Sequence, residues 1–241
     1  MFKINADIIM FDKDGTLIDF DAFWVTVSYK AFSDILKEYG REDVPIDEIL
    51  EAIGVHNGTT DIDGVLCKGT YEQTAQKMCG VLKKYGCDVP FDIAVQSVLA
   101  AYGKNTGVGE IKPTSPKLAD VLRSLKARGK RLAVVTTDNE PITRRCLSAL
   151  GIEELFDKIY TDDGICPPKP DPYCAVDICN TCGIPRERVL MVGDTMTDIE
   201  FATNAGIAVV GIAKNQANRE RLESRADAVI SDMAELLDIV G

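Results

Sequence analysis

The chain has 241 residues, 46% of them hydrophobic, which is enough for one large domain or for a domain that carries an insertion. Its 27 Lys and Arg against 38 Asp and Glu give a net charge of −11, which argues against nucleic acid as a partner. No apolar run is long enough to cross a bilayer, and the N-terminus lacks the pattern of a signal peptide. We therefore expect a cytoplasmic protein with no membrane partner.

The first organising feature is a short apolar run followed by two carboxylates. Residues 8–11 are continuously apolar, which predicts a buried parallel strand. Asp12 and Asp14 follow this strand, and side chains two residues apart in an extended segment point the same way. A divalent cation between them would relieve their repulsion. On its own, however, the Asp-Gly pair is also typical of a surface turn.

A helical region follows. From residue 19 to about 104, apolar residues recur at spacings of three and four, and no strand interrupts them. Four glycines indicate a loop across Gly54–Gly69. We expect helices at about 20–36, 45–53, 71–85 and 91–102.

Strands and helices then alternate to the end of the chain, which predicts parallel strands joined by crossover helices. The expected fold is α/β, a doubly wound parallel sheet with an inserted all-helical cap. We assign 1–18 and 108–241 to the core and 19–107 to the cap. The further strands are expected at 131–135, 156–160, 189–192, 207–212 and 228–230.

Polar side chains follow several of these strands, and the carboxyl ends of parallel strands share one edge of a sheet. Carboxylates suit a divalent cation, while a hydroxyl, free N–H groups and a lysine suit a phosphate group. Taken singly, each residue has an ordinary explanation as a strand end, an exposed loop residue or a solvated helix residue. Their joint order along the chain favours the site. The residues concerned are Asp12, Asp14, Thr136, Thr137, Lys169, Asp194 and Asp198.

Four segments resemble the motifs of the haloacid dehalogenase superfamily of phosphohydrolases, in the family's order and across the whole expected core. The first and last are the most specific. The position of the helical insertion, between the first and second motifs, is similar to the mobile cap of the phosphoglycolate phosphatase group. The segments are FDKDGTL at 11–17, VVTT at 134–137, KPDP at 169–172 and VGDTMTD at 192–198.

The resemblance implies a Mg²⁺-dependent phosphatase in which Asp12 is the nucleophile and forms an aspartyl-phosphate. It implies that Asp14 protonates the leaving oxygen and then activates water. Mg²⁺ would be held by Asp12, the backbone carbonyl of Asp14 and Asp194, with support from Asp198. Phosphate oxygens would be held by Thr136 and neighbouring N–H groups, including Thr137, and Lys169 would steady Asp12 and the phosphoryl group.

Lys13 departs from the family pattern, because many members carry an apolar residue there. We expect its side chain to point away from the two aspartates and to leave the mechanism unchanged.

The substrate expected from the resemblance is a small phosphorylated metabolite, phosphoglycolate first, then a sugar phosphate or a mononucleotide. The loop Gly54–Gly69 is the candidate specificity segment, with His56, Asn57, Lys68 and Thr70 as candidate contacts. His56 is equally well explained as an exposed loop residue. The protein is expected to be a monomer or a homodimer.

Three alternatives stay open. A phosphosugar mutase similar to β-phosphoglucomutase would keep all four motifs and differ in its cap. An inactive binding or regulatory homologue would have lost a nucleophile or a metal carboxylate, and none is missing. A hydrolytic dehalogenase would lack the second aspartate, and Asp14 is present.

The eight cysteines are interpreted as reduced thiols, used as small apolar side chains. Cys179 and Cys182 form a CxxC pair with Cys166 and Cys174 upstream, so a zinc site is conceivable. No second closely spaced pair or nearby histidine completes such a ligand set.

Overall fold

The structure is a computed structural model that describes residues 3–164 and 166–241. The chain divides into two compact units. The core unit combines Met1–Asp19 with Ile111–Gly241, and the inserted unit is Phe20–Glu110. Each unit is described by itself.

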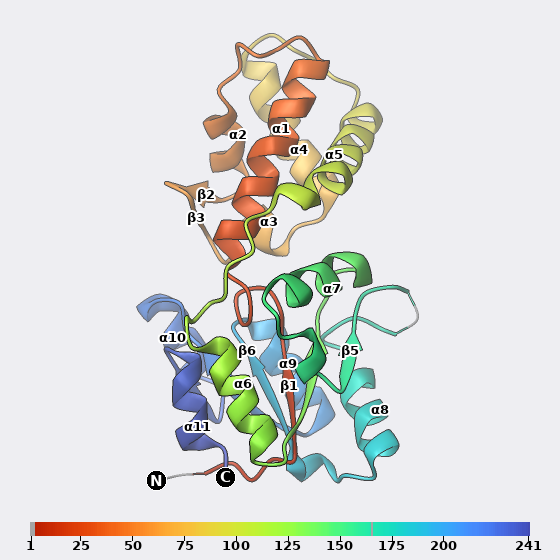
Figure 1. Ribbon diagram of the computed structural model, residues 1–241. Coiled ribbons are helices and arrows are strands. Elements are labelled where there is room, and N and C mark those ends of the chain that lie inside the picture. Colours follow the sequence, from red (N-terminus) through yellow and green to blue (C-terminus); the bar gives the residue numbers. More distant parts are fainter. Residues whose placement is uncertain (1–2, 165) are drawn as a thin grey trace. The chain divides into compact units, whose positions relative to one another are not determined.

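The core unit contains a six-stranded sheet in the order β5-β4-β1-β6-β7-β8, in which every pair of neighbours is parallel (Figure 1). The first strand therefore lies inside the sheet, and the chain adds strands first on one side of it and then on the other. Such a reversal of strand order creates a crevice at the carboxyl ends of the central strands. The strands are β1 (Ile8–Phe11), β4 (Arg131–Val135), β5 (Lys158–Tyr160), β6 (Val189–Gly193), β7 (Ala208–Ile212) and β8 (Ala228–Ile230).

Register brings the ends of the three central strands to one level. Phe11 of β1 is opposite Val134 of β4 on one side and Val192 of β6 on the other. All four residues of β1 are buried, as expected for a strand that is covered on both faces. The residues that follow β1, β4 and β6 consequently emerge side by side at the same edge.

Helices cover both faces of this sheet. Alternate strand residues, such as Ile8 and Met10 of β1, pack in one apolar cluster with Ile178 and Phe201. In Figure 1, α6 and α11 lie to one side of the sheet and α8 to the other. The core helices are α6 (Leu118–Ala127), α7 (Glu140–Ala149), α8 (Tyr173–Cys182), α9 (Met196–Ala205), α10 (Gln216–Glu223) and α11 (Leu236–Ile239). The predicted α/β class, with its doubly wound parallel sheet, is confirmed.

The inserted unit is a bundle of helices in which α1 and α4 both pack against α5. Its interior is apolar, with a buried hydrogen bond of 2.7 Å from the Tyr102 hydroxyl to the Ser28 hydroxyl. A π-helix at Asp21–Val25 leads into α1. The α-helices are α1 (Thr26–Glu38), α2 (Ile46–Ala52), α3 (Val65–Lys68), α4 (Tyr71–Lys84) and α5 (Phe91–Asn105).

One detail of the inserted unit differs from the expectation. The segment predicted as a loop contains α3 and a two-stranded antiparallel hairpin, β2 (Val55–His56) with β3 (Thr59–Thr60). Its turn residues, Asn57 and Gly58, both have positive φ, at 52° and 77°. An Asn-Gly pair is the strongest short-range signal for such a turn, so the hairpin could have been predicted from Asn57 and Gly58.

None of the helices in the described ranges combines the length and the apolar character that crossing a membrane requires.

Candidate active site

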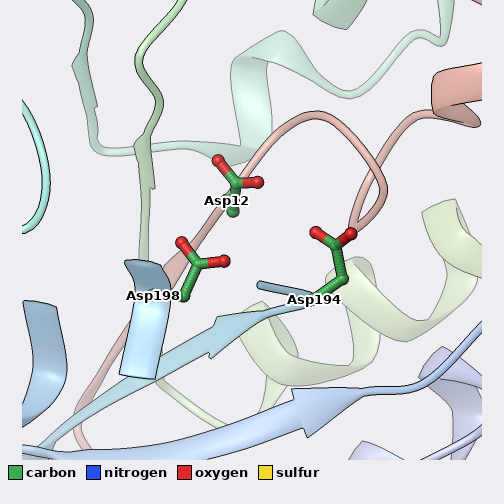
Figure 2. A group of neighbouring side chains, drawn as sticks. All are labelled: Asp12, Asp194 and Asp198. Carbon is green, nitrogen blue, oxygen red and sulfur yellow. The ribbon is translucent and has the colours of Figure 1, made fainter. Parts of the chain in front are cut away.

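Three carboxylates converge at the carboxyl edge of the central strands. One oxygen from each of Asp12, Asp194 and Asp198 lies within 4.8 Å of the other two, and Figure 2 shows the three side chains turned toward a shared space. Asp12 and Asp198 are buried. Three hard oxygen donors in such a group are the ligands that Mg²⁺ prefers.

Each carboxylate is placed by a local feature of the chain. Asp12 directly follows β1, and its N–H donates to the Val192 carbonyl of β6 at 2.9 Å. Asp194 directly follows β6. Asp198 lies in the first turn of α9, where its carboxylate accepts from the N–H and the hydroxyl of Thr195, at 3.0 and 2.6 Å. This capping box fixes the helix start and the Asp198 side chain together.

Two glycines, which have no side chain, make space for the carboxylates of the site. A Cβ on Gly15 would lie 2.2 Å from the Asp194 carboxylate, and Gly15 has a φ of +82°. A Cβ on Gly193 would lie 2.3 Å from the carboxyl carbon of Asp198. Any side chain at either position would therefore displace a carboxylate of the site.

Lys169 is the cation of this group. Its ammonium donates to Asp12 at 2.7 Å and to Asp198 at 2.6 Å, and its side chain is 4% exposed. Burial lowers the pKa of Lys169, but the two adjacent carboxylates outweigh burial and raise it above the ordinary lysine value. Lys169 therefore stays charged and holds the nucleophile candidate against α9.

One lysine does not neutralise three carboxylates. Burial, together with the charge of Asp198, raises the pKa of Asp12 to about 7 despite the opposing effect of Lys169. Burial and the neighbouring Asp12 and Asp198 also raise the pKa of Asp194 well above its ordinary value. A divalent cation among these oxygens would remove the repulsion, so the donor set fits Mg²⁺.

Two predicted threonines follow β4, and a further threonine contacts the carboxylate group itself. Thr136 is buried at the end of β4, where its hydroxyl oxygen accepts from the Asp138 N–H at 3.1 Å, while Thr137 beside it is exposed. Thr16, which was not among the predicted site residues, is fully buried and donates to Asp194 at 3.1 Å. It orients a metal-ligand candidate, and its only sequence signal was its place in the first motif.

The expected orientation of Lys13 was wrong. Its side chain is fully buried and turns toward Asp14, with Nζ 2.6 Å from a carboxylate oxygen of Asp14 and 3.0 Å from one of Asp138. The physical reason is that a buried ammonium requires carboxylate partners, and these two lie within its reach. Burial lowers the pKa of Lys13, but Asp14 and Asp138 more than compensate and raise it.

The cap residues suggested for specificity lie in the inserted unit. His56 is exposed on β2, and Asn57 occupies the hairpin turn at positive φ. Lys68 ends α3 and pairs with Asp63, while the Thr70 hydroxyl caps α4 by accepting from Gln73. Asn57 and Thr70 thus have structural roles within their own unit, and the substrate contacts stay predictions.

The cysteines form no comparable site in the part of the chain that the structure describes. Within 3–164 and 166–241, the three aspartates are the one group of His, Cys, Asp or Glu with metal-ligand spacing. All eight cysteines are free thiols. Their use as small, mostly apolar side chains is consistent with this arrangement.

A parallel α/β sheet with Asp12, Asp198 and Lys169 buried at its carboxyl edge is the arrangement expected of a phosphohydrolase. The model of the family described as haloacid dehalogenase-like hydrolase matches residues 6–206, and the chain belongs to that family. It is a phosphoric monoester hydrolase.

Two relatives are similar to this chain in sequence, and one solved structure is similar to it in fold. A phosphoglycolate phosphatase of Pseudomonas fluorescens is 27% identical over 231 residues, which are 95% of this chain and 78% of the relative. The pyrophosphatase PpaX of Halalkalibacterium halodurans is 28% identical over 243 residues, covering 99% and 98%. The crystal structure of a subfamily IA hydrolase from Geobacter sulfurreducens has a TM-score of 0.70 at 18% identity, covering 100% and 99%, and shows the shared fold.

Proposed function

We propose that the protein is a Mg²⁺-dependent phosphatase that hydrolyses a small organic phosphate monoester through an aspartyl-phosphate at Asp12. The observation that carries the proposal is the buried group in which Lys169 bridges Asp12 and Asp198 beside Asp194. This group offers a carboxylate oxygen next to a fixed cation and a metal-ligand set, which is what phosphoryl transfer to a carboxylate needs.

In the first step, an oxygen of Asp12 attacks phosphorus, a new O–P bond forms and the bond to the leaving oxygen breaks. Asp14 gives its proton to that oxygen. In the second step, Asp14 takes a proton from water, whose oxygen attacks phosphorus and releases inorganic phosphate and free Asp12. Lys169, charged throughout, holds Asp12 in place and offsets the negative charge that builds up on the phosphoryl oxygens.

Asp12, Asp194 and the backbone carbonyl of Asp14 are proposed to hold Mg²⁺, with Asp198 supporting the ion directly or through water. When bound, the ion supplies positive charge that favours the approach of a phosphate to a carboxylate. Thr16 and Thr195 serve this set indirectly, because they fix the orientations of Asp194 and Asp198.

Phosphate oxygens are assigned to Thr136, Thr137 and the N–H groups around them. Support comes from the position of these residues between β4 and α7, since a helix N-terminus favours negative charge. The Thr136 hydroxyl oxygen already accepts from Asp138, so its hydrogen is free to be donated to a ligand.

The inserted unit Phe20–Glu110 is proposed to act as the cap that selects the substrate, as the sequence suggested for residues 19–107. Relatives named phosphoglycolate phosphatase make phosphoglycolate the first candidate, and PpaX adds inorganic pyrophosphate to the substances worth testing. A cytoplasmic location and a monomeric or homodimeric state belong to the same proposal.

The test compares the wild type with Asp12→Asn on an aryl phosphate and on a panel of small phosphate esters that includes phosphoglycolate, a hexose phosphate, a mononucleotide and pyrophosphate, each with and without Mg²⁺. The proposal expects Mg²⁺-dependent release of phosphate by the wild type and its loss in Asp12→Asn. Asp120→Asn, at an exposed position of α6, is the matched control and keeps full activity. Substantial turnover by Asp12→Asn would overturn the proposed nucleophile.

A further inference from the structure

The core contains a second buried lysine that the proposed chemistry does not use. Lys13 lies between the nucleophile candidate and the acid–base candidate in sequence, and its side chain is fully buried. Desolvating an ammonium costs several kcal/mol, so a lysine at this place needs compensation from specific partners. Its partners include Asp14 and Asp138, at 2.6 and 3.0 Å.

We propose that Lys13, anchored by Asp138, is a positioning residue that holds the Asp14 carboxylate in the orientation for proton transfer. This inference rests on the proposed function, because it assumes that Asp14 is the acid–base group. The two buried lysines would then have similar roles, because each lies between an aspartate of the first motif and an aspartate from another part of the chain. Lys169 joins Asp12 to Asp198. Lys13 joins Asp14 to Asp138.

The two carboxylate oxygens of Asp14 have different surroundings. One oxygen, Oδ2, is at ion-pair distance from Lys13. The other, Oδ1, is buried and has no hydrogen-bond partner among the described residues. An ion pair at one oxygen restricts rotation of the carboxylate and leaves the other oxygen to give and take the proton.

The anchor is itself fixed to the loop that follows β4. The Asp138 N–H donates to the Thr136 hydroxyl at 3.1 Å, and its carboxylate accepts from the Asn139 N–H at 2.8 Å. The Asp138 carbonyl accepts from the Asp162 N–H at 2.9 Å. Asp138 thus cannot follow Asp14 freely, and Lys13 ties the acid–base candidate to the same loop that carries the proposed phosphate ligand Thr136.

A purely structural role for Lys13 is the competing explanation, and a double-mutant cycle separates the two. The variants are Lys13→Met, Asp14→Asn and the double variant, assayed for kcat and KM on an aryl phosphate with saturating Mg²⁺. Loss of general acid–base catalysis in Asp14→Asn should lower kcat by roughly 10²–10⁴-fold. Misplacing that group in Lys13→Met should lower kcat by about 10–100-fold with little change in KM.

If Lys13 acts through Asp14, its replacement costs nothing further once Asp14 is gone, so the double variant should match Asp14→Asn within about twofold. If Lys13→Met lowers kcat by the same factor in both backgrounds, the positioning role is overturned. Lys126→Met is the matched control: Lys126 pairs with Asp157 on the surface of the core, and this variant should leave kcat unchanged in both backgrounds.

Lys13→Met leaves two partly buried carboxylates without a cation and can prevent folding. The same cycle is therefore run with Asp138→Asn, which removes the anchor but keeps Lys13 beside Asp14. The expected result is a smaller fall in kcat that also vanishes in the Asp14→Asn background, and persistence of the fall there overturns the inference. Turnover by Asp12→Asn would instead refute the proposed function, so the two failures are distinguishable.

Discussion

Replacing Gly15 by alanine should impair metal binding, because the new Cβ would collide with the carboxylate of Asp194. The new Cβ would lie 2.2 Å from the Asp194 carboxylate, whereas real Cβ contacts essentially never fall below 3.0 Å, so the carboxylate must move by about 0.8 Å. A displacement of about 1 Å at a catalytic site can cost 10²-fold in rate, or about 2.7 kcal/mol of activation free energy. We therefore expect kcat to fall by about 100-fold and the apparent Mg²⁺ affinity to fall with it.

Gly129→Ala is the control, because Gly129 has a similar φ of +79° but no atom within 4 Å of the position of a Cβ. Both variants pay the cost of a positive φ, about 1–2 kcal/mol of folding stability, and only Gly15→Ala disturbs the site. The assay is Mg²⁺ titration by calorimetry and by thermal shift, together with kcat. Wild-type Mg²⁺ affinity in Gly15→Ala, at the same loss of stability as the control, would refute the reasoning.

Three further outcomes follow from the same geometry. Asp194→Asn removes one charged ligand candidate, so the rise in Tm that Mg²⁺ causes in the wild type should disappear; an unchanged rise would place the ion elsewhere. Lys169→Met leaves two buried carboxylates without their cation, which should cost about 3–5 kcal/mol of unfolding free energy in denaturant titration; wild-type stability would contradict that cost. His56→Ala or Lys68→Ala should raise KM for the best natural substrate more than for an aryl phosphate, and equal changes would remove both residues from substrate selection.

The strands of the core were predictable because their sequence signals are local. The four residues of β1 lie in the continuous apolar run that predicted them, and β4 has the predicted bounds 131–135, of which the last four residues are apolar. The convergence of Asp12, Asp194 and Asp198 was also predictable in outline, since parallel strands end at a common edge. The resemblance also named Lys169 as the partner of Asp12, but nothing in the sequence predicted that Lys13 pairs with Asp14 and Asp138.

The orientation of Lys13 could not be predicted, because its partner Asp138 comes from another strand's loop and only the fold brings the two together. We expected this side chain to point away from Asp12 and Asp14, whereas burial at this position forces the ammonium toward carboxylates. The hairpin β2–β3 is a different case, because the Asn57-Gly58 turn signal was present and was outweighed by the surrounding glycines.

The central claim, covalent transfer of the phosphoryl group to Asp12, is tested most directly by trapping the intermediate. The wild-type enzyme is mixed with an aryl phosphate and Mg²⁺, quenched in acid within the first turnover and reduced with borohydride, which converts an acyl phosphate to an alcohol. Peptide mass spectrometry should find the reduced side chain at Asp12, and no such product when substrate is omitted. Rapid turnover with an unmodified Asp12, or with the reduced side chain at another carboxylate, would contradict the account.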